Sequence, residues 1–144
     1  MIRTLPASAR DAVLLLARLV LGVVLVAHGW QKVVTNGLGA TAEGFAGMGV
    51  PVAPVSAAYA GIVELVGGAL ILVGAATALV GVLVALDMLG AAVLVHIGGG
   101  IFAGEGGWEL VGVIGALALV LAAVGAGRYS VDHALAGRRT TAGV

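Results

Sequence analysis

The main pattern in the sequence is a series of long apolar runs separated by glycine-rich stretches. Residues 12–34 form one run, and about 20 mostly apolar residues suffice to cross the hydrocarbon core of a bilayer. Residues 55–97 form a second run that would be about 64 Å long as a single helix, at about 1.5 Å per residue. Because that is about twice the thickness of the core, the run must fold back, and the uncharged turn GAATA lies near its middle. We therefore predict four membrane-spanning helices, at about 9–34, 55–73, 78–97 and 109–125.

Glycine and proline mark the predicted connections between these helices. Residues 35–54 are rich in glycine and contain Pro51 and Pro54, so they predict a long loop, and the glycine-dense residues 98–108 predict a second one. Residues 126–144 predict an interfacial C-terminal segment. At the start of the first helix, the stretch from Ser8 to Asp11 fits the S/T-x-x-acid pattern of a helix cap.

Composition supports a membrane protein and excludes several other classes. The chain has 144 residues, of which 61% are hydrophobic and 10% charged, whereas soluble domains have about 45–50% and about 25%. The formal net charge is zero, so the chain lacks the basic surface of a nucleic-acid-binding protein. It contains no cysteine, which excludes disulfides and thiol redox chemistry by this chain. A cleaved signal peptide is the less favoured interpretation of the first run, because Arg18 interrupts it and no A-x-A-like site follows.

The basic residues predict the orientation in the membrane. Most of them lie near the termini: Arg3, Arg10, Arg128, Arg138 and Arg139. The positive-inside rule then places both termini in the cytoplasm. In this orientation Trp30 and Trp108 lie at the outer boundary and Tyr129 at the inner one, as expected for an aromatic belt. The predicted fold is therefore all-α, an integral membrane four-helix bundle with cytoplasmic N- and C-termini.

Three ionisable residues lie inside the predicted spans. Arg18, Glu64 and Asp87 fall within about 8 Å of depth, from the rise of an α-helix. A charge at the bilayer centre costs at least about 2.5–3.5 kcal/mol, and an arginine between two carboxylates would offset much of that cost. We therefore predict that all three face the interior and meet one another as a candidate proton relay. A purely structural ion network is the alternative interpretation.

A second group of polar residues lies nearer the predicted outer face. His28, Gln31 and Lys32 occupy one stripe of the first helix, at i, i+3 and i+4. His96 ends the third helix at similar depth, and Glu109 begins the fourth. These five residues are candidates for substrate binding. We predict no metal site, because the tight H-x-x-x-H and E-x-x-H spacings are absent, and a bis-histidine haem would need a wide cavity in a Gly- and Ala-rich bundle.

At these residues the chain resembles the DoxX family of small four-helix membrane proteins. The matching stretches are RLVLGVVLVAHGWQK, GVPVAP, ELVGGALILVG, ALDMLGAAVLVHIGGGIF and GAGRYSVDHAL. The resemblance implies a multi-pass protein of the bacterial inner (cytoplasmic) membrane that is a subunit or accessory of a redox complex, linked to quinone, thiosulfate or oxidative stress. The recurrent polar residues of the family fall on Arg18, His28, Gln31, Lys32, Glu64, His96 and Arg128. Relatives often have an arginine in the turn after the second helix, where this chain has Thr77 and Ala78.

Three functional hypotheses follow. The first is a quinone-binding subunit or accessory of a redox complex, with no intrinsic cofactor, in which His28 or His96 hydrogen-bonds the quinone and Glu64 or Asp87 relays protons. Its electrons would come from a protein partner, so the chain is at most a subunit of an oxidoreductase. The second is a small carrier or proton pathway through Arg18, Glu64 and Asp87. The third is a non-catalytic scaffold that recruits soluble enzymes through the arginine-rich C-terminus. Apart from the lipid bilayer, we expect a protein partner or a homo-oligomer.

Overall fold

The computed structural model describes residues 5–141, and regular structure in that part of the chain is helical. Residues 1–4, which include Arg3, residues 142–144, and the side chains of residues 139–141, which include Arg139, lie outside the description. The α-helices are α1 Ala7–Trp30, α2 Leu38–Gly47, α3 Ala53–Ile62, α4 Gly68–Val73, α5 Thr77–Ala91, α6 Glu109–Val124 and α7 Val131–Thr141. The intervening short turns are η1 Gln31–Thr35, η2 Val63–Gly67, η3 Ala92–His96, η4 Ile97–Gly99 and η5 Ala103–Glu105.

Several of these elements join end to end into helices that can cross a membrane. Ala7–Thr35, Ala53–Val73 and Thr77–Gly99 are each long and apolar enough to do so. The fourth predicted span corresponds to α6, which is apolar but has only 16 residues. Each long helix contains one π-helical turn, with one residue more per hydrogen-bonded ring than an α-helix.

The first helix begins without the predicted cap. Pro6 is the N-cap residue, and its extended backbone starts the helix at Ala7, so Ser8 already lies inside the first turn and makes no capping hydrogen bond. Pro6 fixes this start because proline has no N–H to leave unsatisfied. Asp11 is instead buried, and its Oδ1 accepts a hydrogen bond from the backbone N–H of Arg128 at 3.2 Å.

The prediction of a long loop over residues 35–54 is wrong, because this segment contains α2. Gly37 has φ +80°, a conformation that glycine adopts readily, and it turns the chain out of the first helix. The helix then packs against α3. Buried Thr41 donates a hydrogen bond to the carbonyl oxygen of Lys32 at 2.9 Å and ties α2 to η1. The low helix propensity of its glycines suggested a loop, but contacts with α3 and η1 stabilise a helix there.

The long helices pack as two pairs around a common core. The first helix lies against α4 and η2, and α5 lies against α6. The interior side chains of these pairs form an apolar layer that is almost completely buried: Leu21, Leu25, Ile71, Val84 and Leu121. A Cβ atom built on Gly68 would lie 2.8 Å from the backbone nitrogen of Val26. Glycine therefore permits the backbones of α1 and α4 to touch, as is common between membrane helices.

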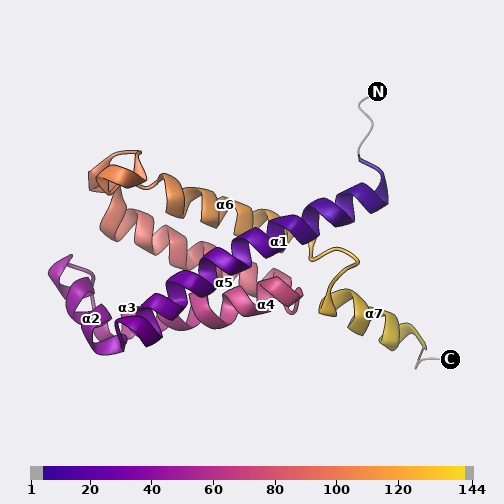
Figure 1. The fold of residues 1–144 in the computed structure, drawn as a ribbon, viewed down its shortest axis with the longest axis horizontal. Helices are drawn as coiled ribbons and strands as arrows, with labels where there is room; N and C mark the ends of the chain where they lie inside the picture. Colours follow the sequence, from indigo (N-terminus) through magenta and orange to yellow (C-terminus); the bar gives the residue numbers. More distant parts are fainter. Residues whose placement is uncertain (1–4, 142–144) are drawn as a thin grey trace.

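Both ends of the described chain lie at the same end of the bundle (Figure 1). The start of α1, the turn between α4 and α5, and α7 are found there, while α2 and the connection between α5 and α6 occupy the opposite end. The hydrogen bond from Arg128 to Asp11 joins the two terminal segments directly. The segment predicted to lie at the interface forms α7 from Val131 onwards, and its position in the interface remains a prediction.

Candidate functional site

A cavity of about 460 Å³ lies in the half of the bundle away from the termini. Its wall is mostly apolar, with residues from α1, α3, α5 and α6 and from the two connections at that end. The ionisable residues that line it are His28, Lys32, Tyr59, Glu64, Asp87 and His96. Ligand sites in proteins commonly have this size and this combination of apolar walls with a few polar groups.

The three π-helical turns bring polar residues to this cavity. Lys32 lies in η1, Glu64 in η2 and His96 in η3, and all three residues line the cavity. A π-helical turn rotates the side chains that follow it relative to a regular helix, and such turns occur frequently at functional sites. Each of the three turns contains one ionisable residue that lines the cavity, which indicates that the turns direct these side chains toward it.

Lys32 and Glu64 form an ion pair at the cavity wall. Nζ of Lys32 lies 2.6 Å from Oε2 of Glu64, with side-chain exposures of 19% and 7%. One turn earlier on α1, a Cβ atom on Gly29 would lie 2.3 Å from the backbone nitrogen of Leu65. Glycine at this position therefore lets the first helix approach η2 closely enough for the pair to form. The pair neutralises two charges that would each be costly inside a membrane.

Asp87 lies across the cavity on α5 and is 8% exposed. Its Oδ2 atom is buried, and no residue in the described part of the chain makes a hydrogen bond to it. One turn earlier, the carbonyl oxygen of Leu83 accepts a hydrogen bond from the hydroxyl of Tyr59 at 3.2 Å, which connects α3 to α5. Tyr59 was not among the residues that sequence reasoning selected, because a tyrosine in an apolar run has no distinctive spacing.

The two histidines differ in their partners. Nδ1 of His96 lies 2.9 Å from the carbonyl oxygen of Gly106, so Nδ1 carries the hydrogen and Nε2 is left for other partners. This bond holds the α5–α6 connection over the cavity. His28 is half-buried and lines the cavity, and its imidazole ring makes no hydrogen bond within the described residues. Both nitrogens of His28 are therefore available.

Only part of the predicted outer group of residues comes together. His28, Lys32 and His96 line the cavity, as do Glu64 and Asp87 from the predicted proton relay. Gln31 is exposed at the start of η1 and does not line the cavity. Glu109 also lies outside it, and its Oε1 accepts a hydrogen bond from the backbone N–H of Ala103 at 2.8 Å. That bond stabilises the α5–α6 connection.

Arg18 does not meet Glu64 or Asp87, and that predicted contact is wrong. All three residues are buried, as expected, but the guanidinium of Arg18 donates to the carbonyl oxygens of Leu72, at 3.4 Å, and Tyr129. Helix side chains tilt toward the helix N-terminus, so Arg18 reaches toward the termini and away from the two carboxyls. The carbonyl groups at the end of α4 carry partial negative charge, which favours a cation there.

Asp132 forms a further polar contact at the end with the termini. Its carboxylate accepts hydrogen bonds from the backbone N–H groups of Ala76, at 2.7 Å, and Thr77, at 2.9 Å, and so caps the N-terminus of α5. Burial opposes ionisation, but those N–H groups and the charge of Arg18 outweigh it and hold the pKa of Asp132 below its usual range. We call Asp11, Arg18 and Asp132 with their partners the C-terminal anchor. The sequence signal for it was the aspartate in the GRYSVD stretch.

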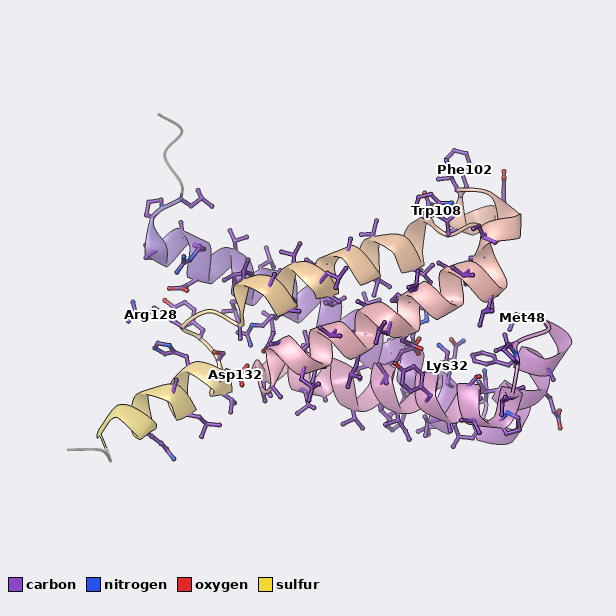
Figure 2. The ribbon with its side chains drawn as sticks, turned by 180° about the vertical axis from the view of Figure 1, so that it is seen from behind. Lys32, Met48, Phe102, Trp108, Arg128 and Asp132 are labelled. Atoms are coloured by element: carbon purple, nitrogen blue, oxygen red, sulfur yellow. The ribbon has the colours of Figure 1, made fainter. Side chains whose placement is uncertain are left out.

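The C-terminal anchor and the cavity are separate sites. Figure 2 shows Arg128 and Asp132 at one end of the molecule and Lys32 and Met48 in the other half. Along the first helix, Leu21 and Leu25 of the apolar layer lie between Arg18 and His28. Val84 of the same layer precedes Asp87 on α5. Apolar packing therefore lies between the two polar groups.

Comparison with known proteins identifies the family of the chain. Among residues 5–141, no group of three histidine, aspartate or glutamate side chains is arranged to hold a metal ion. No curated protein and no solved structure matches the chain. The sequence model of the DoxX family matches residues 13–97, more than half of the 144 residues. DoxX is a membrane family, and with three helices suited to a lipid bilayer the protein is an integral membrane protein. The chain belongs to the DoxX family.

Proposed function

We propose that the protein is a membrane subunit or accessory of a quinone-linked redox complex and that its cavity binds the quinone ring. The observation that carries this proposal is the combination of an apolar cavity of about 460 Å³ with ionisable side chains from three helices. Apolar walls suit a ring and its tail, and the few polar groups suit the ring oxygens. The resemblance to relatives described as parts of redox complexes supports the same conclusion.

The cavity residues have the chemistry that quinone reduction and quinol oxidation require. Reduction of a quinone adds two electrons and two protons to its ring oxygens, and oxidation removes them. His28 can donate a hydrogen bond to a ring carbonyl, and the ammonium of Lys32 has donors beyond the one that Glu64 occupies. Asp87 and His96 can exchange protons with the ring oxygens. The chain has no cysteine for thiol redox chemistry, and in this proposal a partner protein supplies the electrons.

We place this cavity in the outer half of the bacterial inner membrane. In this proposal α6 is the fourth span. Its length is about 24 Å, and the segments on either side of it extend across the rest of the hydrocarbon core, which is about 30 Å thick. Arg10, Arg128 and Arg138 belong to the segments at the end with the termini, so the positive-inside rule places that end in the cytoplasm. Because the cavity lies at the other end, it faces the outer leaflet.

A transmembrane proton pathway has less support than quinone binding. Such a pathway would need polar groups or water across the full depth of the bundle. The apolar layer separates Asp87 from Arg18 instead. Proton exchange is therefore proposed only between the cavity and the aqueous phase on the outer side.

The binding proposal is tested by thermal unfolding in detergent or nanodiscs with added decylubiquinone. We expect the quinone to raise the melting temperature of the wild-type protein, and we expect His28→Ala to remove most of that rise. His133→Ala is the matched control, because His133 is exposed on α7 and outside the cavity. No rise in the wild-type protein, or an equal rise in both variants, would contradict the proposal.

The orientation is tested by cysteine labelling, which the cysteine-free chain makes simple. Single cysteines replace Ser8, at the start of α1, and Gly104, in η5, both of which are exposed. A maleimide that cannot cross membranes should label the Gly104→Cys protein in intact cells and the Ser8→Cys protein only after permeabilisation. The reverse pattern would place the cavity on the cytoplasmic side.

A further inference from the structure

We infer that a tailed ligand enters the cavity sideways from the bilayer, between α3 and α5, and that Asp87 is the residue that hydrogen-bonds its head group. This inference rests on the proposed quinone binding and adds to it an entry route and a hydrogen-bonding partner for the head group. It selects Asp87, rather than Glu64, as the carboxyl that meets the ligand.

The cavity is open to the lipid-facing side of the bundle. Among the lining residues that are exposed, three lie on α3, α5 and η3: Tyr59 at 40%, Leu86 at 55% and Leu94 at 48%. All three lie in helices that can cross a membrane, so this opening faces acyl chains rather than water. A ligand that enters here must dissolve in the bilayer.

The helices on the two sides of this opening diverge. The main contacts of α3 are with α1, α2 and η2, whereas α5 packs mostly on α6. In Figures 1 and 2, α2 and the α5–α6 connection stand apart at the end away from the termini. The hydrogen bond from Tyr59 to Leu83 bridges α3 and α5 on the side of the opening nearer the termini. We call the gap bounded by Tyr59, Leu86 and Leu94 the side portal.

The α5–α6 connection covers part of the cavity at the end away from the termini. Ala103 and Gly107 of the α5–α6 connection line the cavity from that side. The connection is held by the bond between His96 and Gly106 and by the bond from Ala103 to Glu109. An entry route through this connection would have to break these bonds, whereas the side portal needs no such change.

The polar groups inside the cavity differ in whether they already have a partner, and this difference identifies the group that hydrogen-bonds the ligand. Glu64 is already paired with Lys32. Oδ2 of Asp87 is buried, and within the described residues it has no hydrogen-bond partner. A buried carboxyl oxygen without a partner is costly, and a ligand that exchanges a hydrogen bond with it would remove that cost. A quinone carbonyl can accept a hydrogen bond from the protonated carboxyl of Asp87, and a quinol hydroxyl can donate one to its carboxylate.

The role of Asp87 is tested by equilibrium binding of two probes to protein in nanodiscs. The probes are decylubiquinone and decylbenzene, which have the same tail but differ in the head group: only the first is a quinone, with two carbonyls, two methoxy groups and a methyl group on the ring. We expect the wild-type protein to bind the quinone at least about tenfold more tightly than decylbenzene. Asp87→Leu should reduce this difference clearly, leaving the share that His28 and Lys32 contribute, and Asp87→Asn, which keeps a hydrogen-bonding head, should restore most of it. An unchanged preference in Asp87→Leu would overturn the assignment of Asp87.

The side portal is tested by association kinetics of decylubiquinone with a matched pair of variants. Leu86→Trp places a bulky ring in the portal, and Leu89→Trp places the same ring on an exposed residue of α5 that does not line the cavity. We expect the association rate to fall about tenfold or more in Leu86→Trp only. Equal rates in the two variants would reject the portal while quinone binding stands. Failure of the wild-type protein to bind any quinone would instead reject the proposed function itself.

Discussion

Nζ of Lys32 lies 2.6 Å from Oε2 of Glu64, and this contact joins the end of the first membrane helix to the middle of the second. Each group lies in a π-helical turn, and the two turns meet where Gly29 allows the backbones to approach. An ion pair in a largely apolar setting is not stabilising in itself, because both charges lose hydration. Each charge nevertheless depends on the other, since removal of one leaves its partner unpaired.

Single substitutions in this pair should therefore destabilise the protein more than the double substitution. We expect Lys32→Met or Glu64→Leu to lower the free energy of unfolding by about 3–5 kcal/mol, because each leaves a buried charge without a partner. The double variant Lys32→Met/Glu64→Leu should lose clearly less than the sum of the single losses. The measurement is reversible unfolding in mixed micelles with increasing SDS.

The control for the ion pair is Glu43→Leu, which removes an exposed carboxylate of α2. Surface substitutions of this kind change stability by about 0.5 kcal/mol or less. Additive losses in the double variant would mean that Lys32 and Glu64 do not interact in the membrane.

Gly29 controls how closely α1 approaches η2. In Gly29→Ala the added Cβ would lie 2.3 Å from the backbone nitrogen of Leu65, and a backbone atom cannot move aside as a flexible side chain can. We expect this variant to lose about 1–3 kcal/mol of stability and to bind decylubiquinone more weakly, because the ion pair is pulled apart. Gly39→Ala is the control: nothing lies near its added Cβ, and alanine favours the helix. Equal stability of the two variants would show that the contact at Gly29 is not tight.

Helical periodicity and run length accounted for much of the fold and for part of the site. The residue spacing predicted that His28 and Lys32, four apart, share a helix face, and both line the cavity. The same reasoning placed Gln31 with them, yet it is exposed. A π-helical turn begins at Gln31 and changes the direction in which the side chains point. The local sequence contains no signal that predicts this turn.

The failures of sequence reasoning concern contacts that depend on tertiary structure. Depth along the membrane placed Arg18 near the two acids, but depth does not give the direction in which a long side chain extends. Carbonyl groups at helix ends were not considered as partners, although they accept hydrogen bonds as carboxylates do. The α2 helix was missed for a related reason, since its glycines have low helix propensity and its stability comes from packing on α3.

Arg18 supports the C-terminal anchor rather than the cavity. In Arg18→Met the carbonyl groups of Leu72 and Tyr129 lose their donor, and we expect a loss of about 1–3 kcal/mol for each buried carbonyl left unpaired. The affinity for decylubiquinone should change by less than twofold, because the apolar layer separates Arg18 from the cavity. SDS unfolding and binding in nanodiscs measure the two effects. A large loss of decylubiquinone binding with unchanged stability would contradict this prediction and show that Arg18 contributes to the binding site.

Asp132 should make the stability of the protein sensitive to acid in a defined range. Its pKa is lower in the folded protein than the unfolded value of about 3.9, so its stabilising effect is fully present above that pH and disappears as the pH falls through the folded pKa. Asp132→Asn cannot ionise and should be less stable than wild type by about 1 kcal/mol at neutral pH, the usual contribution of a helix cap. Unfolding of both proteins from pH 8 to pH 3 isolates this effect, since the other titrating groups are common to both. A difference that stays constant above about pH 5 and shrinks in stronger acid is expected, and a difference that grows on acidification would mean that Asp132 does not cap α5 as a carboxylate.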